Sequence, residues 1–421
     1  FQFGMNWASY SRFVGDVFGA PLAMEALVAF FLESTFLGLW IFGWDRLSPK
    51  LHLATIWAAA IGATLSAYFI VAANSWMQHP VGVIFNPETG RAEMVDIVAV
   101  LTNSTTLAAY PHVIAGAILT AAVFVGGISA YLLTREKETA PADRGALRKA
   151  MRVSIYLTFA AGIAVAVSGD LQARLMFEQQ PMKMASAEAL CDTETNAGLS
   201  VFAVNDPGSD CSVQTWTVPD LLSLMATHSL DGEVRGINDV QAQYTEQFGP
   251  NDYRPNLAVT YWGFRAMIGF GAIASFGAVV AWWLTRGGRD LPRKRWVRLA
   301  SIAVIPTPFL ANAAGWIFTE MGRQPWVVAP NPNGIPEVRL LTSDAVSGAV
   351  STPMVIATLG GFALLYGVLL VVEIGLLRRY VQAGPEAVMP PTDQGPPDDD
   401  PDGGGTAPSD DAEADVLAFA Y

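Results

Sequence analysis

The stretch that decides the fold is G-W-I-F-T-E-M-G-R-Q-P-W, residues 315–326. An apolar helix reaches Trp316, meets a carboxylate at Glu320 and an arginine at Arg323, and ends before Pro325. Charged side chains at the end of a membrane-type helix are costly, so they indicate a functional site. Three residues apart, the acid and the arginine share one helix face. The acid could bind a metal and the arginine an anion. The simpler interpretation is an interfacial ion pair with tryptophan anchors.

The composition indicates a polytopic membrane protein. Of the 421 residues, 52% are hydrophobic and 15% are charged. Several apolar stretches reach the roughly 20 residues needed to cross a bilayer, which excludes soluble enzyme classes. The net charge of −13 is largely local, because ten acids lie between Glu386 and Asp415, in a tail without Lys or Arg. Nothing in the sequence indicates nucleic acid as a partner.

Hydropathy predicts an all-α membrane protein, a helical bundle with seven transmembrane spans. The predicted spans are about 13–42, 52–74, 107–134, 152–170, 258–285, 298–319 and 345–377. Basic residues cluster after the first, third, fifth and seventh spans. By the positive-inside rule these ends are cytoplasmic, which predicts a multi-pass protein of the cytoplasmic (inner) cell membrane with its C-terminus inside.

The chain divides into four predicted regions: spans one to four (1–170), a polar loop outside the membrane (171–257), spans five to seven (258–380) and an acidic tail (381–421). The loop holds both cysteines, Cys191 and Cys211. We expect a disulfide between them, because thiols outside the cytoplasm are commonly oxidised; two free thiols are the alternative. The tail is rich in Pro, Gly and Asp, so we expect it to be disordered in the cytoplasm.

Two acids, Glu25 and Glu33, lie within the first predicted span. Eight residues correspond to about 12 Å of helix, and the two side chains fall on the same half of its surface. Acids inside a membrane often mark ion or proton routes. We expect Glu25 near mid-membrane and Glu33 closer to the inside, so that together they form a proton ladder. The alternative is a pair neutralised by protonation and hydrogen bonds.

Three residues at similar depth near the outer surface suggest a haem site. His112 opens the third span, and Arg265 and Met267 open the fifth. Imidazole and thioether are a known axial pair for a low-spin haem. Arg265 would suit a haem propionate, because guanidinium binds carboxylate as a fork. A lone histidine is more often a satisfied polar residue than a ligand, so the matching depth carries this prediction.

The outer loop begins with a charged pair, Lys183 and Glu188, just past the membrane surface. Such a pair could orient a quinol headgroup and accept its protons. The alternative is two solvated surface charges of little energetic consequence.

Together these motifs resemble subunit I of the cytochrome bd-type quinol oxidases over about residues 1–380. The resemblance is carried by six motifs: G-W-x-x-x-E-x-G-R-Q-P-W (315–326), E-A-L-V-A-F-F-L-E-S-T-F (25–36), G-W-D-R-L (43–47), W-M-Q-H-P (76–80), F-R-x-M (264–267) and Q-P-x-K-M-A (180–185).

The resemblance implies three haems. His112 and Met267 would be axial ligands of a low-spin haem b that takes electrons from quinol. Glu320 would bind a high-spin haem b. Glu25 would lie beside the iron of haem d, a chlorin that reduces oxygen, and Glu33 would be a station on its proton path.

The resemblance also implies roles for five further positions. Arg265, Trp316 and Arg323 would hold haem propionates and link the haems. Lys183 and Glu188 would form the quinol-binding pair of the outer loop.

One departure concerns the family's nine spans, two of which precede the position of Phe1. The first of those carries a haem-ligating histidine, and none of the four histidines here matches it: His52, His79, His112 and His228. We therefore expect two further helices before Phe1. We expect activity only with them and with subunit II, in a heterodimer to which small single-span accessory subunits could add.

The implied function is a terminal respiratory oxidase. Quinol would be oxidised outside and O2 reduced to water with protons from inside, which generates proton-motive force without pumping. Three alternatives remain open: a cyanide-insensitive oxidase with haem b in place of haem d, a proton-coupled transporter that uses Glu25 and Glu33, and a structural haem-binding subunit without oxygen chemistry.

Overall fold

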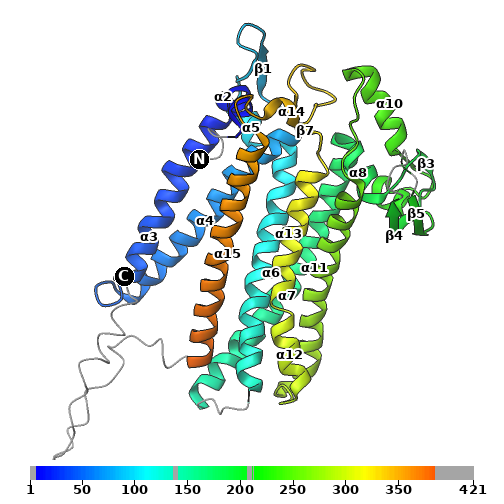
Figure 1. The fold of residues 1–421 in the computed structure, drawn as a ribbon. Coiled ribbons are helices and arrows are strands. Elements are labelled where there is room, and N and C mark those ends of the chain that lie inside the picture. Colours follow the sequence, from blue (N-terminus) through cyan, green and yellow to red (C-terminus); the bar gives the residue numbers. More distant parts are fainter. Residues whose placement is uncertain (1–5, 136–140, 206–210, 212, 385–421) are drawn as a thin grey trace, which may run out of the picture. The chain divides into compact units, whose positions relative to one another are not determined.

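Figure 1 shows a computed structural model that describes residues 6–135, 141–205, 211 and 213–384. Within these residues seven helices are long and apolar enough to cross a membrane, which confirms the predicted number of spans. They are Ala8–Phe42, Pro49–Gln78, Ile97–Thr134, Asp143–Gln179, Leu257–Gly288, Arg295–Met321 and Thr352–Ala383.

The chain divides into two compact units, Phe1–Ala363 and Leu364–Tyr421. The site residues all belong to the first unit. The described part of the second unit is the end of α15 (Thr352–Ala383), whose apolar side chains are exposed. From residue 385 onward the predicted acidic tail lies outside the described residues.

The first span contains an unusual turn. It joins α2 (Ala8–Met24), a π-helix over Glu25–Phe30 and α3 (Phe31–Phe42). Proline in a helix interior cannot donate its backbone hydrogen bond, and Pro21 lies one turn before the wider segment. Short π-helical segments occur frequently at functional sites. The π-helical turn begins at Glu25, which is one of the predicted site residues.

The second span, α4 (Pro49–Gln78), packs closely against the first at Gly62. A Cβ atom at this position would lie 2.9 Å from the backbone nitrogen of Glu33. Small residues let membrane helices approach closely, and packing is what holds them together in lipid. The approach places α4 beside both predicted acids of the first span.

A group of long helices forms the other part of the first unit. It contains α6 (Ser104–Thr134), α7 (Pro141–Gln179), α11 (Leu257–Thr285), α12 (Arg295–Ala303) and α13 (Pro306–Met321). Leu119, Val123, Ala161 and Ala274 form a buried apolar cluster between α6, α7 and α11. Asn103 caps α6, because its side chain accepts from the backbone nitrogen of Thr105.

Several helix ends differ from the predicted spans, including the start of α7 at Pro141 instead of residue 152. α7 continues past residue 170 to Gln179, because the polar residues that follow still favour a helix and only Pro181 interrupts it. The last span begins at Thr352 instead of residue 345, after a segment that includes Ser347, Gly348 and Ser351. Hydropathy reports the apolar part of a helix, and α7 is longer than that part.

Short elements gather at the end of the helices that carries residues 315–326 (Figure 1). They are α5 (Ile97–Leu101), α8 (Pro181–Glu188), α9 (Leu221–Thr227), α10 (Ile237–Phe248), α14 (Thr342–Ala345) and the antiparallel pairs β1 (Val83–Asn86) with β2 (Arg91–Met94), β3 (Glu194–Thr195) with β6 (Glu233–Val234), β4 (Leu199–Asn205) with β5 (Val213–Val218), and β7 (Trp326–Val328) with β8 (Leu340–Leu341). Cys191 and Cys211 form a disulfide in this region, with the sulfur atoms 2.16 Å apart.

Candidate functional site

Glu320 lies at the end of α13 and accepts hydrogen bonds on both carboxylate oxygens. Asn74 Nδ2 donates to Oε1 at 2.8 Å, and Arg323 Nη2 donates to Oε2 at 2.6 Å. The guanidinium of Arg323 is buried, and among the described residues no acceptor meets its Nε or Nη1 atoms. Burial lowers the pKa of Arg323, while Glu320 acts against this effect. Buried donors without acceptors are costly, so this arginine is suited to hold an additional anionic group.

A chain of polar side chains leads from Glu320 to Lys183. Asn74 Oδ1 accepts from Gln78 Nε2 at 2.8 Å, and Gln78 Oε1 accepts from Lys183 Nζ at 3.2 Å. Gln180 Nε2 also donates to the backbone oxygen of Gln78, at 3.1 Å. Buried polar networks of this kind hold side chains in defined positions. The network therefore joins the end of α13 to α8 through the end of α4.

Lys183 is almost completely buried and is not a solvated surface charge. Its Nζ atom lies 5.0 Å from the centre of the Phe318 ring, and a Cβ atom at Gly322 would lie 2.9 Å from its Cγ atom. Burial, and to a smaller extent Arg323, lowers the pKa of Lys183 to about 7, while Glu320 acts in the opposite direction. An amine with a pKa near 7 is poised to exchange protons.

Glu188 lies at the other end of α8 and forms an ion pair with Arg265, 2.5 Å between Oε2 and Nη2. Arg265 also donates through Nη2 to the backbone oxygen of Ser200 at 2.6 Å. Burial raises the pKa of Glu188, and Arg265 opposes this shift. In this structure Arg265 therefore binds a protein carboxylate, and Lys183 and Glu188 belong to two separate polar groups instead of one pair.

The predicted axial residues, His112 on α6 and Met267 on α11, each face a glycine. A Cβ atom at Gly169 would lie 3.2 Å from His112 Cε1, and one at Gly315 would lie 2.7 Å from the sulfur of Met267. Ser168 Oγ lies 3.1 Å from His112 Nδ1. A partner on one ring nitrogen orients an imidazole and leaves the other nitrogen for a metal.

The acids of the first span are partly buried. Ser66 on α4 donates to Glu25 Oε1 at 2.8 Å. Glu33 lies about two turns further along the helix, at the close approach of Gly62. Trp316, in contrast, is 56% exposed on α13 and belongs to none of the hydrogen-bonded groups above.

An aromatic pocket adjoins Lys183 and Arg323. Its volume is about 20 Å³, and its walls include Tyr244, Tyr253 and Trp326. The rings of Tyr253 and Trp326 stack with their centres 5.2 Å apart. A space of this size holds about one water molecule, so a quinol ring would have to displace these side chains.

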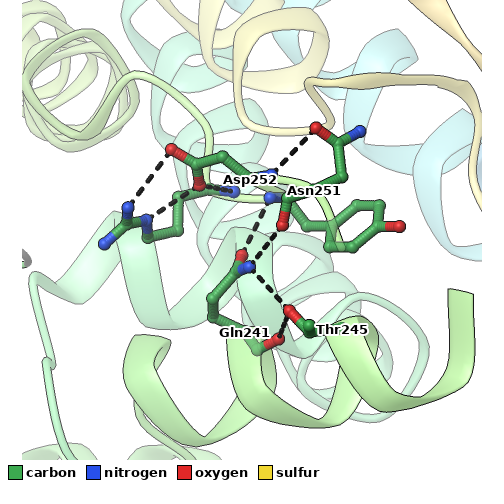
Figure 2. Close-up of polar contacts among 6 residues, drawn as sticks. Gln241, Thr245, Asn251 and Asp252 are labelled. Carbon is green, nitrogen blue, oxygen red and sulfur yellow. Dashed lines mark hydrogen bonds and ion pairs between the residues drawn. The ribbon is translucent and has the colours of Figure 1, made fainter. Parts of the chain in front are cut away.

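Figure 2 shows the polar contacts that hold the turn before α11. Gln241 Nε2 donates to Thr245 Oγ1 at 3.1 Å and to the backbone oxygen of Asn251 at 2.7 Å. Gln241 Oε1 accepts from the backbone nitrogen of Tyr253 at 2.8 Å. One glutamine of α10 thus positions an aromatic wall of the pocket.

The described residues contain no group of three or more His, Cys, Asp or Glu that could hold a metal ion. Isolated ligands do suit haem iron, which a protein holds through one or two axial side chains. The glycines let the His112 and Met267 side chains pack closely against α7 and α13, and the unmet donors of Arg323 suit a haem propionate.

A family model for cytochrome bd terminal oxidase subunit I matches residues 1–385. The chain belongs to this family. The family assignment makes the chain a membrane-embedded subunit of a quinol:oxygen oxidoreductase that contains haem. It favours the oxidase interpretation over the transporter.

Two curated relatives agree with the assignment. Cytochrome bd ubiquinol oxidase subunit 1 of Bacillus subtilis (strain 168) is 43% identical over 387 residues, which cover 92% of this chain and 79% of the relative. Cytochrome bd-II ubiquinol oxidase subunit 1 of Escherichia coli (strain K12) is 32% identical, over 92% of this chain and 84% of the relative. Their designation as subunit 1 implies a partner, subunit II.

A solved structure of the bd oxidase from Geobacillus thermodenitrificans has the same fold. The TM-score is 0.75 at 29% sequence identity, over 90% of this chain and 81% of the solved chain.

Sequence reasoning missed three polar residues of this bd-oxidase subunit: Ser66, Asn74 and Gln78. Each lies on α4 and bonds to a predicted site residue or to the next member of the network. Their polarity inside a membrane helix was the available signal, because side-chain amides and hydroxyls there usually find partners on other helices.

Proposed function

We propose that His112 and Met267 hold a low-spin haem b, that Glu320 holds a high-spin haem b, and that Glu25 lies beside haem d. The observation that carries this proposal is the buried guanidinium of Arg323, which pairs with Glu320 and still has two unmet donors. When bound, the haems supply the electron transfer and the oxygen reduction. The chain would supply iron ligands, orientation and proton transfer.

Lys183 is the proposed proton acceptor at the quinol site, and Glu188 with Arg265 fixes the other end of α8. A buried amine that titrates near pH 7 can take a proton from a quinol hydroxyl and pass charge into the polar chain. Gln78 and Asn74 hold the side chains of Lys183 and Glu320 in fixed positions relative to each other. Trp316, exposed on α13, is proposed to contact a haem.

Lys183→Met is expected to lower quinol oxidation and to flatten its pH dependence. In the native protein the amine becomes neutral as the pH rises through about 7, so turnover should increase over that range. Turnover with saturating quinol, measured between pH 6 and 8.5, tests this. Lys149→Met, at the opposite end of the helices, is the control. If the turnover of Lys183→Met rose with pH as steeply as that of the native enzyme, Lys183 would not be the proton acceptor.

Glu33 and Glu25 are proposed as successive stations for protons from the cytoplasm. Ser66 holds the Glu25 carboxylate, and the π-helical turn begins at that residue. Proton release outside and uptake inside separate charge without a pump, and each charge moved against 100 mV stores about 2.3 kcal/mol. The quinol loop then lies outside and the C-terminal tail inside the cytoplasmic membrane, with subunit II and small accessory subunits as partners.

Glu33→Gln is expected to slow oxygen consumption at least tenfold while the haem spectrum stays unchanged, because the amide cannot release a proton. Glu373→Gln, another membrane carboxylate, on α15, is the matched control and should be neutral. Oxygen uptake by purified complexes measures both. Equal turnover of Glu33→Gln and the native complex would remove Glu33 from the proton path.

A further inference from the structure

A second cavity lies at the end of the helices away from Glu320. Its volume is about 360 Å³, within the range of small-molecule sites. Its walls come from the later part of α6, the earlier part of α7, the later part of α11 and from α12. They are almost entirely small or apolar side chains, such as Gly126, Ala130, Ile155 and Ala278. The predicted haem residues are absent from this lining.

A smaller basic pocket adjoins this cavity. The two share Met151 and Leu291 as walls. The basic pocket is lined by five arginines, Arg144, Arg148, Arg152, Arg289 and Arg293, and by one acid, Asp290. Asp290 pairs with Arg148 at 2.5 Å. One carboxylate against five guanidinium groups leaves the pocket strongly positive.

The basic pocket is built from two segments that are far apart in the sequence. Arg144 and Arg152 belong to α7, whereas Arg289 and Arg293 belong to the connection between α11 and α12. Like charges brought together in this way repel each other, and a bound anion removes that cost. Guanidinium groups bind phosphate oxygens as a fork, which lysine cannot do.

We propose that the two pockets together bind one anionic phospholipid. The arginines bind the headgroup phosphate and an acyl chain fills the apolar cavity. Basic pockets between membrane helices recognise anionic headgroups in this way. The wall residues Phe276 and Trp296 are 66% and 52% exposed, so part of the cavity wall lies at the surface of the helix group, where an acyl chain could enter.

Because the apolar cavity and the basic pocket share walls, the site favours a phospholipid over two other ligands, a neutral quinone and inorganic phosphate. A neutral quinone would fill the cavity without needing five arginines. Inorganic phosphate would bind the arginines without needing an apolar cavity of about 360 Å³. A phospholipid uses both, and bound there it ties α7 to the α11–α12 connection.

The test uses the intact oxidase complex with its partner subunit, reconstituted into bilayers of phosphatidylcholine with a graded fraction of phosphatidylglycerol. Lipid retained after transfer to mild detergent is measured by native mass spectrometry. The native complex is expected to retain phosphatidylglycerol over phosphatidylcholine at least tenfold above their bulk ratio. Retention at the bulk ratio would overturn the proposal without any variant, and would leave the haem assignments untouched.

Two variants assign the site. Arg144→Gln with Arg293→Gln is expected to reduce this preference at least tenfold, whereas Arg46→Gln with Lys50→Gln, basic residues after the first span, should leave it unchanged. An equal loss of the phosphatidylglycerol preference in both double variants would indicate binding to general surface charge. It would refute the basic pocket as the binding site.

Ala278→Leu tests the acyl-chain half, because it places three further carbons in the cavity. It should weaken phosphatidylglycerol retention with the arginines intact. Unchanged retention, or displacement of the lipid by inorganic phosphate alone, would show that the cavity does not contribute. An extracted quinone in place of the lipid would also contradict the proposal. The haem absorption of every variant reports whether the complex has assembled.

Discussion

His112→Ala and Met267→Ala are each expected to abolish the low-spin haem signal and quinol oxidation together. Removing a partner behind a metal ligand typically costs about 10–100-fold in affinity or activity, so removing the ligand itself should exceed that range. Alanine leaves a gap opposite Gly169 or Gly315 and supplies no atom that can bind iron. Reduced-minus-oxidised spectra of the purified complexes, with quinol-driven oxygen uptake, provide the measurement.

Ser168→Ala is the graded control for this experiment. It removes the 3.1 Å contact with His112 Nδ1 but keeps the imidazole. The haem band should persist, with turnover reduced much less than in His112→Ala. A normal spectrum in His112→Ala and Met267→Ala would show that the ligands have been assigned wrongly.

Glu320→Ala is expected to have the second largest effect. It removes the proposed ligand of the high-spin haem and leaves the buried Arg323 without its carboxylate. Breaking a fully buried ion pair from one side costs about 3–5 kcal/mol, because the remaining charge is not compensated. The cost should be lower here, because the Glu320 side chain is 31% exposed. Haem content per complex should fall by one b-type haem, and the midpoint of thermal unfolding should decrease.

Glu337→Ala is the matched control, since Glu337 is an exposed acid in the connection between β7 and β8. It should change neither haem content nor unfolding. If Glu320→Ala kept its full haem complement while losing stability, Glu320 would be a structural partner of Arg323 and not a ligand.

The number of membrane helices could be predicted from sequence because the bilayer imposes one length and one polarity on each span. Helix ends could not be predicted in the same way. α7 extends to Gln179 because nothing before Pro181 disfavours a helix, and hydropathy does not respond to the polar part of a helix. The π-helical turn at Glu25–Phe30 has no apolar periodicity of its own, and Pro21 was its only signal.

For the candidate site, sequence identified single residues better than their partners. Charged or ligand-type side chains inside apolar helices stand out one by one, as Glu25, His112 and Glu320 do. Which of them meet depends on packing between helices. Thus the sequence did not predict that Arg265, expected to hold a propionate, pairs with Glu188, or that Arg323 keeps unmet donors beside Glu320.

The most direct measurement of the central claim is the visible absorption spectrum of the purified, dithionite-reduced complex, combined with extraction of its pigments. The proposed ligands at one end of the helices should hold b-type haems, and the red band of a chlorin should accompany them. Extraction of haem b alone would support the alternative oxidase without haem d. A pure complex containing this chain that showed no haem absorption would contradict the account.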